Sequence, residues 1–134
     1  MIAPAIHFPG NCNEAIALYQ KAFNMTIDSI DYFRDAPPDS GMTISKDEHN
    51  KVMHAELTIC GSRVNMSDSN PNDIIVGNII VLNVFLDTGD DVCKAFNILK
   101  ENGKIHVELG PQFFSSMYGS VEDRFGIRWQ LISL

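Results

Sequence analysis

The sequence predicts an α+β fold made of two modules, each with the order strand–helix–strand–strand–strand (βαβββ). Three observations support this prediction. Apolar strands alternate with two amphipathic helices, the order of elements in the first half returns in the second, and a polar, turn-rich stretch at Ser69–Asp73 separates the halves. We expect a single domain over residues 1–134, with module one at 1–68, a linker at 69–78 and module two at 79–134.

Module one begins with a short apolar strand over Ala3–Phe8, which Pro9-Gly10 ends. Asn11 is expected to cap the helix that follows, with Glu14 in the capping-box position. Apolar residues at i, i+3, i+4, i+7 and i+8 predict that this helix buries one face, formed by Ala15, Leu18, Tyr19, Ala22 and Phe23.

A second strand is expected over Met25–Phe33, followed by a segment without periodicity, Arg34–Asn50. This segment is either a lid or a solvated connector. Val52–Cys60 alternates between apolar and polar residues, and Arg63–Asp68 returns after Gly61-Ser62, so these residues predict a hairpin.

Module two repeats the pattern. A strand is expected over Ile79–Leu86, and Thr88 should cap a helix that Asn102-Gly103 ends. Lys104–Leu109 reads as a strand and Gly110–Ser120 as a loop that carries Phe113, Phe114, Met117 and Tyr118.

The last fourteen residues predict a turn at Glu122–Gly126 and a final strand. Ile127, Trp129 and Leu131 alternate with Arg128, Gln130 and Ile132 along it. The first set suits a core. The second mixes a cation, an amide and an aliphatic side chain, which suits the wall of a binding cavity.

Composition restricts the function classes. A net charge of −7 with scattered Lys and Arg argues against nucleic acid or an anionic membrane as partner. Apolar runs fall short of the roughly 18 residues of a membrane span, so we expect a cytoplasmic protein. Cys12, Cys60 and Cys93 lack a C-x-x-C spacing and are expected to be free thiols.

Four short motifs in order resemble the PhnB-like branch of the vicinal oxygen chelate superfamily, which includes glyoxalase I, extradiol dioxygenases and bleomycin-resistance proteins. The motifs are Pro9-Gly-Asn-Cys-Asn-Glu-Ala-Ile-Ala-Leu-Tyr19, Met53-His-Ala-Glu-Leu57, Met66-Ser-Asp-Ser69 and Asp123-Arg-Phe-Gly-Ile-Arg-Trp129. The resemblance implies a curved mixed sheet with helices on its outer face, a ligand cavity inside and a homodimer. Members of this branch have been described as ubiquinone-pathway methyltransferases, but this sequence has no Gly-rich loop between a strand and a helix for a nucleotide-type cofactor.

The superfamily commonly holds a divalent metal with His, Glu or Gln ligands on the first and last strands of each module. By resemblance those places fall near Pro4, Asn65, Val81 and Gln130, where only Gln130 is a usual ligand type. A one-residue bulge on the first strand would bring in His7. We therefore expect no cofactor and no metal.

Two His-x-Glu pairs, His54-Ala-Glu56 and His106-Val-Glu108, each place an imidazole and a carboxylate on one face of a strand, where they could bind metal or act as an acid–base pair. We expect His106 to be a solvent-exposed edge residue, and we select His54 and Glu56 as the candidate catalytic residues. The candidate ligand-binding residues are Asn65, Ser67, Arg128, Gln130, Phe114 and Tyr118.

Other residues have competing interpretations. Trp129 suits core packing better than substrate stacking. Asp123 and Arg124 suit a role in fixing the turn, although Arg124 could pair with an anionic group. Cys12 stands at a helix N-terminus, which could lower its thiol pKa, although a small buried side chain is the simpler interpretation.

Three functions follow. The leading hypothesis is a small-molecule-binding protein or enzyme that uses the sheet cavity without metal. The alternatives are a metal-dependent lyase, isomerase or dioxygenase of the same fold, and a resistance-type protein that sequesters a drug. The sequence leaves open whether any reaction is catalysed.

Overall fold

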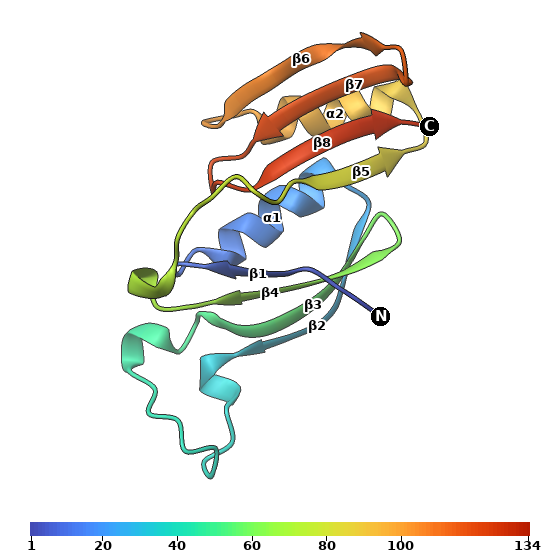
Figure 1. Ribbon diagram of the computed structural model, residues 1–134. Coiled ribbons are helices and arrows are strands. Elements are labelled where there is room, and N and C mark those ends of the chain that lie inside the picture. The colour runs from blue at the N-terminus through green and yellow to red at the C-terminus, as the bar shows by residue number, and fades with distance from the viewer. The chain divides into compact units, whose positions relative to one another are not determined.

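The computed structural model describes residues 1–134 and contains two βαβββ modules, as predicted (Figure 1). Each module has its own four-stranded mixed sheet and one α-helix of 11 residues. Two compact units are formed by residues 1–17 with 25–74 and by residues 18–24 with 75–134. The first helix therefore contributes to both units. Neither helix is long and apolar enough to cross a membrane.

Module one consists of β1 (Ala5–Phe8), α1 (Cys12–Ala22), β2 (Met25–Tyr32), β3 (Val52–Ile59) and β4 (Ser62–Asp68). Its strands are ordered β1-β4-β3-β2. β1 and β4 are parallel, whereas β3 is antiparallel to both of its neighbours. Cys60 and Gly61 take φ values of 48° and 86° in the two-residue turn between β3 and β4. Two positive φ values are typical of the type I′ turn, so the predicted hairpin is confirmed.

Module two consists of β5 (Leu82–Leu86), α2 (Gly89–Leu99), β6 (Lys104–Gln112), β7 (Ser115–Glu122) and β8 (Arg128–Ser133). Its strand order is β5-β8-β7-β6. As in module one, the first strand pairs with the last, and the third lies between the last and the second. β5 is parallel to β8, and β7 is antiparallel to β8 and β6. Thr88 Oγ1 accepts a hydrogen bond of 3.1 Å from the Asp91 amide, so the predicted cap of α2 is confirmed.

The prediction of a loop over Gly110–Ser120 is wrong, because Ser115–Glu122 is strand β7. Its serines made this segment look like a loop. Two of these serines are buried, and Ser115 Oγ lies within hydrogen-bonding distance of the Ser133 backbone oxygen at 3.0 Å. A buried hydroxyl with a strand partner is compatible with a sheet, but sequence periodicity does not identify that partner.

The predicted strand over Ile79–Leu86 begins too early. Strand β5 starts at Leu82, and Ile79 and Ile80 are 96% and 77% exposed. A run of apolar residues predicts burial only where the fold provides a surface to cover it.

The predicted side-chain cap of α1 by Asn11 is also wrong. Asn11 Oδ1 has no hydrogen-bond partner. The acceptor is instead Asp68 at the end of β4, whose Oδ1 receives the amides of Gly10 at 3.1 Å and Cys12 at 3.0 Å. Its Oδ2 receives the Val52 amide at 2.9 Å. One buried carboxylate therefore satisfies the free amides at the start of α1 and at the start of β3.

The core of the second unit is built around Trp129, which is 1% exposed. The rings of Tyr19 and Phe23, near the end of α1, lie 5.1 and 5.0 Å from its ring. Core packing of Trp129 is thus confirmed. Its indole Nε1 donates to Asp123 Oδ2 at 2.9 Å, so the core around it contains one charged side chain.

Asp123 also fixes the turn before β8, as predicted. Its Oδ1 accepts the amides of Phe125 and Ile127 at 2.9 and 3.1 Å, and its Oδ2 accepts the Tyr19 hydroxyl at 2.6 Å. Gly126, with φ of 87°, provides the reversal. Asp123 is only 2% exposed, so water does not solvate its carboxylate. The two amides, the Tyr19 hydroxyl and the Trp129 indole donate the hydrogen bonds instead.

We predict that Asp123→Asn lowers the free energy of unfolding by about 3 kcal/mol, because an amide group turns an NH₂ towards donors that need an acceptor. Urea unfolding at neutral pH measures the change. The exposed Glu101→Gln removes the same charge at the end of α2 and should change stability by less than about 0.5 kcal/mol. Equal stability of Asp123→Asn and the unmodified protein would contradict the assignment.

Candidate functional site

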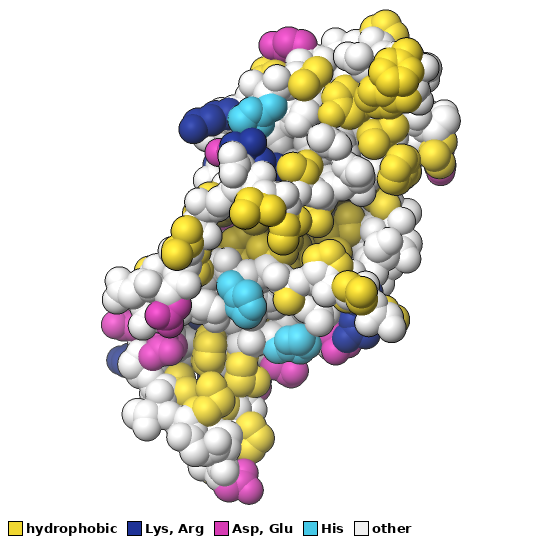
Figure 2. Space-filling model, viewed as in Figure 1, with side chains coloured by type: hydrophobic (Ala, Val, Ile, Leu, Met, Phe, Trp, Pro, Cys, Tyr) yellow, Lys and Arg dark blue, Asp and Glu magenta, His cyan; other side chains and the backbone are white.

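Module one has a polar sheet face opposite its core. Ala55, Leu57, Val64 and Met66 of β3 and β4 are buried, so the alternating residues between them face the other way. Glu56 is directly opposite Asn65, and His7 of β1 is opposite Ser67. Figure 2 shows histidine side chains exposed over this sheet. We call this surface the open face of module one.

Glu56 is the centre of a three-residue cluster on the open face. Its Oε1 is 3.5 Å from His54 Nε2 and forms an ion pair with Arg63. The side chains of all three residues are between 33% and 44% exposed, so a ligand can reach them. The arginine balances the carboxylate charge, and the carboxylate in turn orients the imidazole.

Donors and acceptors continue along β4 and β1. Arg63 Nε donates to Asn65 Oδ1 at 3.2 Å. His7 Nδ1 lies 3.1 Å from Ser67 Oγ and 2.9 Å from Ser69 Oγ. These contacts fix the ring of His7 and leave its Nε2 to interact with a ligand.

Module two carries a similar cluster around Glu122. Arg128 Nη2 and His106 Nε2 lie 3.0 and 3.5 Å from its Oε1. Arg128 Nε is buried and has no hydrogen-bond partner, so this guanidinium has an unused donor. His106 is an exposed residue of the edge strand β6, as expected, and its side chain reaches across to Glu122 of β7.

Gln130 lies two residues after Arg128 on β8, opposite Asn83 of β5 and Ser120 of β7. Of the aromatic residues selected from the sequence, Tyr118 lies in the middle of β7 and Phe114 just before its start. The rings of Phe114 and Tyr118 are 5.1 Å apart and edge-on. Tyr118 is buried, whereas Phe114, in the turn between β6 and β7, is 52% exposed.

The predicted site residues therefore fall into two groups. His54, Glu56, Asn65 and Ser67 lie together on the open face of module one, whereas Arg128, Gln130, Phe114 and Tyr118 belong to module two. Sequence reasoning missed Arg63 and Glu122. The spacing of Arg63 from Asn65, two residues along one strand, indicates the same face, but the contact of Arg63 with Glu56 depends on the register between strands.

The metal of the superfamily does not fit the residues at its expected places. Proline and valine side chains, at Pro4 and Val81, offer no donor atom. The β1–β4 register is continuous from Ala5 to Phe8, so β1 has no bulge to shift His7. No group of three or more His, Cys, Asp or Glu side chains is arranged to hold a metal ion.

Comparison with known proteins agrees with this fold. The model of the Glyoxalase/Bleomycin resistance protein/Dioxygenase superfamily matches residues 2–131. Protein YjdN of Escherichia coli strain K12 is 27% identical over 139 residues, which cover 97% of this chain and 92% of YjdN.

Two solved structures are similar over nearly their whole length. The PhnB protein from Bacillus cereus is 27% identical with a TM-score of 0.81, covering 99% of this chain and 98% of that one. Protein PA1353 from Pseudomonas aeruginosa is 28% identical with a TM-score of 0.82, covering 99% and 96%. The chain therefore belongs to the glyoxalase/bleomycin-resistance/dioxygenase superfamily. Within it, the chain is a member of the PhnB-like branch.

Cys12 is buried at the start of α1, as the simpler interpretation predicted. Burial, together with the nearby Asp68 carboxylate, raises the pKa of the Cys12 thiol to about 12 from an ordinary value of 9.0. The alternative of a lowered pKa at the helix N-terminus is wrong. Desolvation of a thiolate outweighs the helix dipole here, and Asp68 supplies a negative charge where the dipole is positive.

Cys12 should make stability depend on pH in the alkaline range. The folded pKa lies above the unfolded one, so its contribution is complete below pH 9 and disappears as the pH rises to about 12. Between these values we expect the free energy of unfolding to fall by about 1.4 kcal/mol per pH unit on account of this residue. Comparison of urea unfolding for the unmodified protein and Cys12→Ala isolates that slope.

Cys93→Ala is the matched control and should retain the slope, because Cys93 is only partly buried. A thiol reagent at pH 8 should label Cys60 and Cys93 in the folded protein and Cys12 only after unfolding. Rapid labelling of Cys12 under native conditions would contradict the assignment.

Proposed function

We propose that the protein binds a small organic molecule carrying oxygen groups, and that it does so through side chains rather than a bound metal. The observation that carries the proposal is the open face of module one. There, His54, Glu56 and Arg63 form a connected cluster beside Asn65 and Ser67. Small-molecule sites use a small number of well-placed polar groups to orient the ligand, and this cluster supplies such groups.

The chemistry of the cluster is that of an acid–base pair. An imidazole can take up and release a proton, and a carboxylate at its side stabilises the charged form. Arg63 supplies a fixed positive charge that would attract a carboxylate or a developing enolate on the ligand. We therefore propose His54 and Glu56 as the proton-transferring residues and Asn65 and Ser67 as ligand-orienting residues.

We propose a second set of ligand-binding residues within module two. The Arg128 side chain is 27% exposed and Gln130 presents an amide two residues further on the same strand, so both could bind oxygen atoms of a ligand. Phe114 and Tyr118 would supply apolar contact area. The supporting evidence is the chemistry of these side chains; Phe114 is exposed and Gln130 half-buried, whereas Tyr118 is buried.

A screen of small carbonyl and carboxylate compounds by thermal shift tests the proposal. We expect a stabilising compound whose affinity falls about tenfold or more in His54→Gln and in Glu56→Gln, since each variant loses a charge-assisted contact. His49→Gln is the control, because His49 is exposed in the segment before β3. Affinity should be unchanged by a chelator, and metal analysis of protein purified without chelator should find less than stoichiometric metal.

Two results would favour the other functions. Stoichiometric divalent metal, with binding lost on chelation, would indicate a metal-dependent enzyme of the superfamily. Stabilisation by bulky drugs alone, without turnover of small carbonyl compounds, would indicate a drug-sequestering protein.

We also propose a homodimer. The linker before β5 carries four exposed apolar side chains, with Ile75 and Ile79 94% and 96% exposed and Val76 and Ile80 65% and 77% exposed. Side chains this apolar are costly to leave in water, so a second copy of the chain is the proposed cover.

Light scattering after size exclusion should therefore give twice the chain mass of 14.9 kDa. The double variant Ile79→Glu/Ile80→Glu should shift the protein towards the monomer, because it would bury charges at the interface. Ile2→Glu, at another fully exposed isoleucine, serves as the control. A monomeric unmodified protein at micromolar concentration would contradict the proposal.

A further inference from the structure

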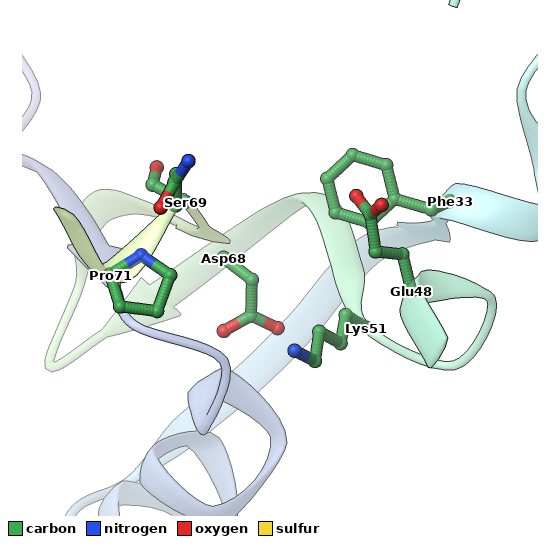
Figure 3. Close-up of a pocket in the computed structure, with 7 residues that line it drawn as sticks. Phe33, Glu48, Lys51, Asp68, Ser69 and Pro71 are labelled. Carbon is green, nitrogen blue, oxygen red and sulfur yellow. The ribbon is translucent and has the colours of Figure 1, made fainter. Parts of the chain in front are cut away.

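A separate pocket of about 270 Å³ lies at the end of the module-one sheet where β4 stops. It shares no residue with the cluster around Glu56. Three segments of the chain meet there: the end of β2, the residues before β3, and the residues after β4. Figure 3 shows two walls with charged residues between them; Phe33 and Glu48 form one wall, Ser69 and Pro71 the other, and Asp68 and Lys51 lie between.

Backbone hydrogen bonds hold this pocket in shape. The Phe33 amide donates to the Lys51 oxygen at 3.1 Å, and the Lys51 amide donates to the Glu48 oxygen at 3.0 Å. The Ser69 amide donates to the Phe8 oxygen at 2.7 Å, which fixes the opposite wall. Because the walls of the pocket are already positioned, little conformational entropy is lost when a ligand binds.

Both carboxylates of the pocket accept hydrogen bonds from other groups of the chain. Asp68 accepts three backbone amides, and Glu48 Oε1 accepts the Ser45 hydroxyl at 2.8 Å. Lys51, in contrast, takes part in none of the ion pairs of the chain. Its ammonium group lies against Gly10, where an added Cβ would be only 3.1 Å from Nζ. The lysine charge therefore lies beside Gly10 and has no direct anionic partner.

The charges of the pocket select the class of ligand. Lys51 alone would attract an anion, but Glu48 and Asp68 carry two negative charges against its one positive charge, so a simple anion would also be repelled. A molecule with both an anionic and a cationic group can pair with the lysine and with a carboxylate of the pocket at the same time. The ring of Phe33 and the ring of Pro71 provide apolar contact for the rest of such a molecule.

We propose that this pocket binds a small amino acid with an apolar or aromatic side chain. The carboxylate of the ligand lies on Lys51, its ammonium group on Glu48, and its side chain between Phe33 and Pro71. The amide Nδ2 of Asn70, which also lines the pocket, provides a further donor to the carboxylate.

Calorimetric titration of the full chain with three related probes tests the ligand class. L-phenylalanine carries both charges, 3-phenylpropionate lacks the ammonium group and phenethylamine lacks the carboxylate. We expect L-phenylalanine to bind about tenfold or more tightly than either analogue, since each analogue loses one charge-assisted contact. The proposal is overturned if either analogue binds as tightly, or if L-phenylalanine does not bind up to its solubility limit.

Variants then locate the bound ligand. Lys51→Met and Glu48→Gln should each weaken binding about tenfold. Lys46→Met changes an exposed lysine of the same segment that does not line the pocket, and Glu56→Gln changes the open face; both should bind as the unmodified protein does. Melting temperatures confirm folding, and Glu48→Gln decides the result if Lys51→Met fails to fold. Equal losses in Lys46→Met, or none in a folded Lys51→Met or Glu48→Gln, would contradict the site.

Discussion

The carboxylate of Asp123 is the interaction on which the second unit depends. It joins the turn before β8, the indole of Trp129 in β8 and the hydroxyl of Tyr19, which is 104 residues away in the chain. A buried charge is costly unless several donors surround it, and removal of any partner leaves the charge less well satisfied. The four hydrogen bonds therefore stabilise one another, and together they set the position of β8 and of the end of α1.

Asp68 has the corresponding role in module one, although it is not at the equivalent position in the sequence. It receives amides from the start of α1 and from the start of β3, so it fixes where both elements begin. This use has a consequence for the pocket beside it. The oxygens of Asp68 accept backbone amides and form no ion pair with Lys51. The charge on the lysine therefore remains available to a ligand.

Periodicity predicted the fold well, because alternation and helical spacing report directly which residues a strand or helix buries. It failed where a partner came from far away in the chain. The acceptor for the Cys12 amide is 56 residues distant, and the buried Ser115 of β7 has its hydrogen-bond partner in Ser133. The candidate site shows the same limit. His54 and Glu56 were found because they share a strand, whereas Arg63 and Glu122 join their clusters through the register between strands, which the sequence alone does not give.

The two clusters would offer the proposed ligand a set of donors that differs from the metal of the superfamily. Arg63 and Arg128 each stand two residues before an amide side chain, Asn65 or Gln130, on the last strand of a module. Each arginine binds a glutamate that also contacts a histidine. A guanidinium places positive charge near the expected ligand position, as a metal would, but it binds only through hydrogen bonds in its own plane. Ligands chosen by such a site should present a carboxylate or enolate edge rather than a pair of chelating oxygens.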